Sequence, residues 1–262
     1  MDLQLSGRTA LVTGASRGMG LEVVRVLQEE GVTVVTASRS VTPELAGTGA
    51  TPLLGDLSQP DVPARIVAEA LEVTGTLDIL VNNVGGGDAG APGTGFLGFS
   101  EQAWASTFAL NLFAAVRTTR AALPALLASR GAVVNVSSDS ARRPHTAPLP
   151  YGAAKAALNA VTKGLSEEFG PQGVRFNTVS PSSTRTALWE GEQSFGADLA
   201  QSMDLTQEEL IAALPSQMGM LTGRFIEPRE IATTIVHLVS PLAASVHGAT
   251  WVVDAGVSKT VA

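Results

Sequence analysis

The sequence contains one tyrosine, Tyr151, and Lys155 follows it four residues later in a segment whose periodicity predicts a helix. Residues four apart share one helix face, so both side chains can act on the same small molecule. A phenol titrates near about 10, and a neighbouring ammonium favours the phenolate. We therefore expect Lys155 to lower the pKa of Tyr151 and to assist its proton exchange near neutral pH. Ser138, at the end of a predicted strand, offers a hydroxyl that can orient a substrate oxygen.

A glycine-rich segment, Thr-Gly-Ala-Ser-Arg-Gly-Met-Gly at residues 13–20, follows a predicted strand and opens a predicted helix. In that setting glycines let the backbone approach a pyrophosphate at the helix N-terminus. The alternative is a tight strand-to-helix turn without a ligand. Its place in the first strand–helix unit of the chain favours a dinucleotide site.

The second predicted strand ends in Ala37-Ser38-Arg39, where coenzyme choice is made in dinucleotide folds. An acid there holds the ribose 2′-hydroxyl, whereas a cation accommodates a 2′-phosphate. The acid is absent, and two guanidinium groups, Arg39 and Arg17 of the glycine-rich segment, can fork onto a phosphate. The pattern predicts NADP(H), with NAD(H) as the alternative. The alternative interpretation is that both arginines are ordinary solvent-exposed charges without a ligand.

Together these motifs resemble the short-chain dehydrogenase/reductase family over nearly the whole chain, through TGxxxGxG spacing, Asp56-Leu57, Asn82-Asn83-Val84-Gly85 and YxxxK. The resemblance implies the catalytic set Asn111, Ser138, Tyr151 and Lys155. It implies cofactor contacts from Gly14, Ser16, Arg17, Gly18, Met19, Ser38, Arg39, Asp56, Leu57, Asn83, Gly85, Tyr151, Lys155, Pro181, Thr184 and Thr186. The implied reaction is hydride transfer between nicotinamide and a carbonyl or alcohol carbon, with Tyr151 as acid or base.

The resemblance also implies a role for Asn111, which distorts its helix in the family and serves a proton relay through the lysine. Two positions depart from the family pattern. Ser182 follows Pro181 where the family has glycine, and we expect this to alter the backbone turn. Ala255 stands in a Val-Asp-Ala-Gly element where the family has Val-Asp-Gly-Gly, and we expect it to affect packing more than chemistry.

These residues need a scaffold, and short β-branched runs alternate with helical periodicity along the chain. The runs predict strands at 9–13, 33–38, 51–55, 79–82, 133–137, 175–180 and 250–253, and helices at 18–30, 62–74, 101–129, 151–170 and 229–239. The prediction is a Rossmann-type α/β fold, a doubly wound parallel sheet with helices on both faces. One dinucleotide-binding and catalytic domain is expected across 1–262, with a substrate loop or lid inserted at about 186–224.

Composition excludes several classes of function. The net charge of −7 argues against nucleic acid as a partner. The absence of cysteine removes disulfides and thiolate chemistry, and the three histidines are scattered, so no metal site is expected. No apolar run reaches the roughly 18 residues of a membrane span, and the first residues do not resemble a secretory signal. We expect a cytoplasmic protein without a membrane partner, and the family resemblance implies a homo-oligomer, a tetramer or a dimer.

Substrate choice is expected in residues 86–100, 139–150 and 186–224. The last segment carries many large apolar side chains, among them Leu188, Trp189, Phe195, Leu199, Met203, Leu214, Met218 and Met220. They predict a small-molecule carbonyl or alcohol substrate of apolar character, unless they pack a lid onto the core. Two alternatives stay open. One is a reductase of 3-oxoacyl groups on acyl carrier protein, and the other is a non-catalytic dinucleotide-sensing or scaffold protein.

Overall fold

Seven parallel strands form one sheet in this computed structural model, which describes residues 2–86, 95–192 and 194–259. The strands are β1 (Thr9–Thr13), β2 (Thr33–Ser38), β3 (Thr51–Leu54), β4 (Ile79–Asn82), β5 (Ala132–Val136), β6 (Arg175–Pro181) and β7 (Thr250–Val253). Their order is β3-β2-β1-β4-β5-β6-β7, so the chain winds outward from β1 in one direction and then from β4 in the other. This confirms the predicted doubly wound sheet.

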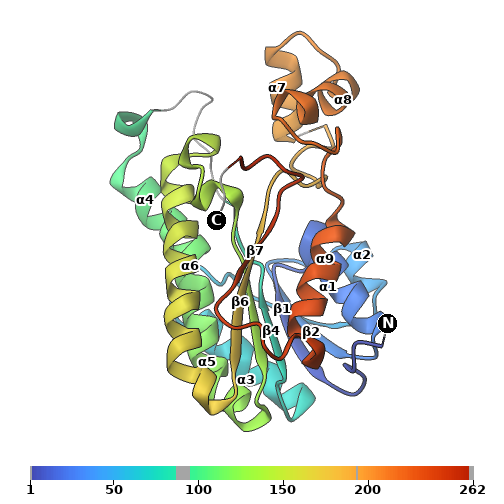
Figure 1. The fold of residues 1–262 in the computed structure, drawn as a ribbon, viewed down its shortest axis with the longest axis vertical. Coiled ribbons are helices and arrows are strands. Elements are labelled where there is room, and N and C mark those ends of the chain that lie inside the picture. Colours follow the sequence, from blue (N-terminus) through green and yellow to red (C-terminus); the bar gives the residue numbers. More distant parts are fainter. Residues whose placement is uncertain (1, 87–94, 193, 260–262) are drawn as a thin grey trace.

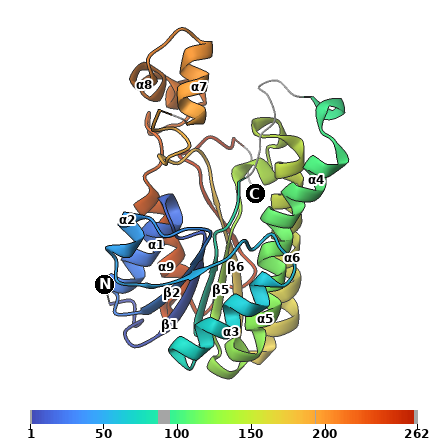
Figure 2. The same ribbon diagram turned by 180° about the vertical axis from the view of Figure 1, so that it is seen from behind.

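Helices cover both faces of the sheet (Figures 1 and 2). They are α1 (Gly18–Glu29), α2 (Pro43–Ala46), α3 (Val62–Thr74), α4 (Glu101–Phe108), α5 (Ala114–Ser129), α6 (Leu149–Phe169), α7 (Phe195–Ser202), α8 (Gln207–Gln217) and α9 (Pro228–Val239). Helices α1 and α9 lie on one face, and α3, α5 and α6 lie on the other. Among the described residues, no helix has both the length and the apolar character that crossing a bilayer requires.

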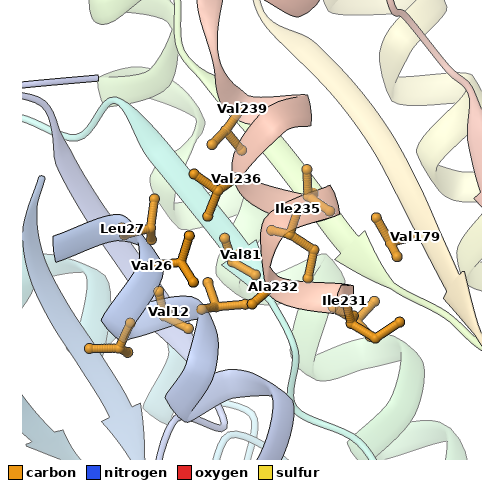
Figure 3. Close-up of a cluster of buried hydrophobic side chains, with 14 of the residues drawn as sticks. Val12, Val26, Leu27, Val81, Val179, Ile231, Ala232, Ile235, Val236 and Val239 are labelled. Atoms are coloured by element: carbon orange, nitrogen blue, oxygen red, sulfur yellow. The ribbon is translucent and has the colours of Figure 1, made fainter. Parts of the chain in front are cut away.

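The core is divided by the sheet, because successive strand residues point to opposite faces. Val12 and Val81 pack with α1 and α9 on one face (Figure 3). Their neighbours Leu11 and Leu80 pack with α3 and α5 on the other face. Strands covered on both sides read as continuous apolar runs, which is why the strand positions could be predicted from the sequence.

The long helix expected at 101–129 is interrupted, at the position where the family resemblance implied that Asn111 distorts it. A π-helical segment, Ala109–Phe113, separates α4 from α5. Asn111 lies in this segment, and its Nδ2 donates a 2.9 Å hydrogen bond to the carbonyl of Thr107. A side chain that bonds to the backbone one turn earlier competes with regular helical bonding, so the break follows from the asparagine.

The expected insertion at 186–224 contains two helices that periodicity did not reveal, α7 and α8. They stand beyond the edge of the sheet at which β6 ends (Figure 1). Both are short, which weakens any periodic signal. A local signal did exist, since Thr206 and Glu209 form a capping box at the start of α8. Whether this region closes over a ligand stays a prediction.

Ala255, two residues after the end of β7, adopts a left-handed conformation with φ of 53°. A side chain costs about 1–2 kcal/mol there, while glycine carries an entropy penalty of about 0.5–1 kcal/mol. We therefore expect Ala255→Gly to raise the free energy of unfolding by about 0.5–1 kcal/mol, measured by urea denaturation. The control is Ala160→Gly on the exposed side of α6, which should lose about 1 kcal/mol. Destabilisation of both variants alike would contradict the strain at Ala255.

Candidate active site

The glycine-rich segment forms a loop between β1 and α1, and hydrogen bonds from the residue that follows the neighbouring strand β4 fix its conformation. Asn83, just after β4, donates from Nδ2 to the carbonyl oxygens of Thr13 at 3.2 Å and Gly14 at 3.0 Å. Gly14 has φ of 68°, and a Cβ placed on it would lie 3.0 Å from Asn83 Nδ2. The turn therefore needs glycine for its conformation and for its close approach to the next strand.

The start of α1 has free amides for an anion. Arg17 is the N-cap residue, and its side chain makes no capping hydrogen bond. Helix amides without a capping partner, at the positive end of the helix dipole, suit a phosphate. A Cβ on Gly18 would lie 3.3 Å from the methyl of Thr186, so the segment after β6 reaches this loop as expected for a two-sided cradle. These features fit a dinucleotide pyrophosphate.

Other residues predicted to contact the cofactor lie in this loop and after β3, and some of their side chains are engaged within the protein. Ser16 accepts a 2.6 Å hydrogen bond from Thr42 at its carbonyl oxygen, and Met19 packs against the core. The side chain of Leu57 is also buried in the core, which leaves its backbone to face a nucleotide. The hydrogen bond from Ser58 is the main cause that lowers the pKa of Asp56, and the charge of Arg39 adds to it.

At the end of β2, Ser38 is buried and donates a 2.7 Å hydrogen bond to the carbonyl of Ser40. Arg39 and Arg17 are exposed, and neither forms an ion pair within the described ranges. Both guanidinium groups are therefore available to a phosphate at this end of the site.

Ser138, Tyr151 and Lys155 converge at the carboxyl end of β5. Tyr151 lies in the first turn of α6, and its hydroxyl is hydrogen-bonded to Ser138. The Nζ atom of Lys155 lies 5.7 Å from the centre of the Tyr151 ring and donates a 2.9 Å hydrogen bond to the carbonyl of Val136. This lysine is only 2% exposed, so its amine is fixed inside the protein beside the phenol.

Burial controls the ionisation of this pair. Burial raises the pKa of Tyr151 to about 12, with the Ser138 hydrogen bond opposing and the charge of Asp139 adding to the rise. Burial also lowers the pKa of Lys155 to about 8. The expected lowering of the phenol pKa by Lys155 was therefore wrong for the chain alone, because the cost of desolvating both charged forms is the dominant effect.

Asn111 joins this group through the backbone that follows β4. Its Oδ1 accepts a 2.9 Å hydrogen bond from the amide of Gly86, and its Nδ2 donates a 2.7 Å bond to the carbonyl of the same residue. A Cβ on Gly85 would lie 2.9 Å from Lys155 Nζ and 3.0 Å from Asn111 Oδ1. The four predicted catalytic residues thus form one cluster, and Gly85 supplies the space in which the lysine and the asparagine meet.

The segment after β6 keeps its direction despite Ser182. This residue does not adopt a positive φ, so the expected change of the turn is not needed. Its hydroxyl donates a 2.9 Å hydrogen bond to Oδ2 of Asp139, while Thr184 donates a 2.9 Å bond to the carbonyl of Ser182. Pro181 is the last residue of β6 and pairs with Val253 of β7.

Asp139 was predicted only as the first residue of the substrate segment 139–150 and not as a catalytic residue, although an acid directly after Ser138 was a local signal. Its side chain is 10% exposed and forms an ion pair with Arg143 at 3.3 Å. Oδ1 of Asp139 accepts a 3.3 Å hydrogen bond from the hydroxyl of Ser138. A buried carboxylate therefore stands in contact with the predicted catalytic serine.

Residues 87–94 of the first substrate segment lie outside the described residues. In the insertion, some of the large apolar side chains are buried against the core and others are exposed. Trp189 is buried, stacks on Phe225 with 4.8 Å between ring centres, and contacts Phe195 edge-on. Leu199, Leu214, Met218 and Met220 also belong to the core or pack against it, whereas Leu188, Phe195 and Met203 are exposed. Most of the group anchors the insertion, which favours the lid-packing alternative over a pocket lining.

A doubly wound parallel sheet with a tyrosine–lysine pair beside a glycine-rich loop defines the class of Rossmann-type oxidoreductases that act on CH–OH and C=O groups. A family model described as enoyl-(acyl carrier protein) reductase matches residues 14–258 of the chain. The chain belongs to the short-chain dehydrogenase/reductase family, which confirms the resemblance inferred from its motifs.

Relatives that act on sugars are similar over nearly the full length of the chain. L-fucose dehydrogenase of Bos taurus is 33% identical, covering 92% of this chain and 86% of the relative. L-xylulose reductase of Bos taurus is 30% identical, covering 99% and 100%. The crystal structure of L-sorbose reductase from Gluconobacter frateurii, complexed with NADPH and L-sorbose, is 27% identical with a TM-score of 0.90, and each chain is covered completely.

Proposed function

We propose that the chain is an NADP(H)-dependent oxidoreductase that interconverts a ketone and a secondary alcohol, with Tyr151 as its acid–base group. The observation that carries the proposal is the cluster of Ser138, Tyr151 and buried Lys155 at the sheet edge that also bears the uncapped start of α1. The similarity to L-sorbose reductase, which is complexed with NADPH, supports the choice of coenzyme.

The residues of the chain divide the work. A bound nicotinamide supplies or accepts the hydride. Tyr151 donates its proton to the substrate oxygen as that oxygen becomes an alkoxide, and Ser138 holds the same oxygen in place. The ammonium of Lys155 stabilises the phenolate that remains. Asn111 holds the backbone of Gly86 against this cluster. In the oxidation, the phenolate of Tyr151 removes the proton of the alcohol.

The substrate that we propose is a small hydroxylated ketone or the corresponding alcohol, rather than the apolar ketone expected from the sequence. The apolar side chains of the insertion mostly face the core, whereas Ser138, Ser140, Asp139 and Ser182 form a hydrogen-bonded polar group beside Tyr151. The names of the relatives, which include reductases of xylulose and sorbose, support a polar substrate.

A substrate panel tests this function. We expect reduction of L-xylulose or L-sorbose with NADPH, followed by nicotinamide absorbance, and little turnover of an apolar ketone of equal size. Turnover of an acetoacetyl thioester alone would instead support the acyl-carrier alternative, which a similarity to ketoacyl reductases also keeps open. Tight NADPH binding without turnover of any ketone or alcohol would favour the non-catalytic alternative.

Coenzyme preference is tested at Arg39 and Arg17. We expect Arg39→Gln to raise the KM for NADPH about tenfold and to leave the KM for NADH unchanged, because only NADPH carries the 2′-phosphate. Arg17→Gln should act in the same direction. The control is Arg120→Gln on α5, which is also exposed and lies on the opposite face of the sheet from α1. Equal effects on both coenzymes would contradict phosphate recognition by these arginines.

A further inference from the structure

A buried acid stands beside the proposed catalytic serine without a part in the mechanism above. Oδ1 of Asp139 accepts a hydrogen bond from Ser138 at 3.3 Å, and Oδ2 accepts bonds from Ser182 at 2.9 Å and from Arg143 at 3.3 Å. A buried carboxylate is costly unless it is paired and hydrogen-bonded. Three donors therefore hold this carboxylate in a fixed orientation.

The shortest of these hydrogen bonds comes from a residue that departs from the family pattern. Ser182 stands where the family has glycine, and a glycine has no hydroxyl to donate. The hydroxyl of Ser182 is directed to the carboxylate of Asp139, which lies 43 positions earlier in the chain. Ser182 and Asp139 thus form a pair that connects the end of β6 with the residue after Ser138.

Ser138 lies between this carboxylate and the phenol, since it is hydrogen-bonded to both. A serine hydroxyl has one proton and two lone pairs. The amide and the hydroxyl of Ser140 donate to both lone pairs of Ser138. While no substrate oxygen takes it, the one proton of Ser138 is directed to Asp139 and is not donated to the phenolate, whose formation a hydrogen bond from Ser138 would favour. This arrangement favours a protonated phenol.

The charge of Asp139 acts in the same direction as this hydrogen-bond pattern. In the described part of the chain, the charged groups that face the phenol are Lys155 on α6 and Asp139, and Arg143 acts through Asp139. Arg143 also interacts with Asp254, after β7; hydrogen bonds from Ser258 and Gly256 lower the pKa of that carboxyl against the effect of burial, and the charge of Arg143 adds to the lowering. A negative charge near a phenol disfavours the phenolate, and the pKa of Tyr151 is raised by Asp139 in addition to burial.

We propose that Asp139, held by Ser182 and Arg143, is a positioning residue that orients the Ser138 hydroxyl and keeps Tyr151 in its acid form. The inference rests on the proposed function of Tyr151. Its consequence is that reduction, which needs the protonated phenol, extends to higher pH than it would without the carboxylate. Oxidation, which needs the phenolate, begins at correspondingly higher pH.

The experiment measures kcat/KM against pH in both directions for the full chain. Asp139→Asn keeps the shape of the side chain and removes its charge, so the pKa of Tyr151 falls. We expect the alkaline limb of reduction and the matching limb of oxidation to move together to lower pH by about one unit. Arg143→Gln leaves the carboxylate less compensated and should move both limbs to higher pH.

Ser182→Gly tests the pairing itself. We expect kcat to fall several-fold with KM little changed, because Asp139 loses its shortest hydrogen bond while the substrate keeps its contacts. Ser183→Gly is the matched control, since the neighbouring hydroxyl contacts the sulfur of Met218 and not the carboxylate. Equal losses in the two serine variants would overturn the pairing.

The outcomes separate this inference from the proposed function. Unmoved pH limbs in Asp139→Asn, or in Arg143→Gln if the first variant does not fold, would overturn the role of Asp139 while Tyr151 kept its own. Full activity of a variant without the Tyr151 hydroxyl would overturn the proposed function instead.

Discussion

Replacing Tyr151 with phenylalanine is expected to lower kcat by about 10²–10⁴-fold in both directions, the range that a positioned acid or base contributes. The phenol is the group hydrogen-bonded to Ser138 and placed beside the buried amine of Lys155. Phenylalanine keeps the ring and removes only the hydroxyl, so the loss should fall on the proton transfer and not on the packing of α6.

Binding measurements distinguish a chemical loss from a structural one. The dissociation constant for NADPH, followed by nicotinamide fluorescence, should change by less than threefold, and the thermal midpoint should stay within a few degrees of that of the unchanged chain. Since the chain has one tyrosine, no second phenol can replace the missing hydroxyl. Retention of more than a tenth of the original kcat would remove Tyr151 from the mechanism.

The sequence predicted those parts of the site that depend on local patterns. Tyr151 and Lys155 lie one helical turn apart, and the turn after β1 needs glycines in a recognisable order. The five inner strands, β2, β1, β4, β5 and β6, were predicted within one or two residues because each is buried on both faces. Such features are encoded by neighbours in the chain, so a single sequence contains them.

Contacts between distant segments could not be predicted in the same way. The hydrogen bond from Ser182 to Asp139 joins residues that only the order β5-β6 brings together. The ionisation of the pair also depends on burial, which the sequence does not quantify. Proximity of Lys155 suggested a lower pKa for Tyr151, but desolvation raises it to about 12. The identity of the acid–base residues was therefore predictable from the sequence, whereas their long-range hydrogen bonds and the directions of their pKa shifts were not.

Gly85→Ala is expected to lower kcat by about 10²-fold, because it displaces groups that the mechanism needs. The added methyl would lie 2.9 Å from Lys155 Nζ and 3.0 Å from Asn111 Oδ1. Gly85 does not have a positive φ, so alanine fits its backbone without strain. The amine must then move away from the carbonyl of Val136, and displacements of about 1 Å can cost about 10²-fold in rate.

Gly164→Ala is the matched control, since a Cβ at this position of α6 meets no atom within 4 Å. It should leave kcat unchanged and stabilise the helix by about 1 kcal/mol. A double-mutant cycle then locates the effect of Gly85→Ala. If the methyl acts by displacing the amine, adding Gly85→Ala to Lys155→Met should cost little beyond Lys155→Met alone. Fully additive losses would instead mean that Gly85 serves the site through another contact, such as the backbone that Asn111 holds.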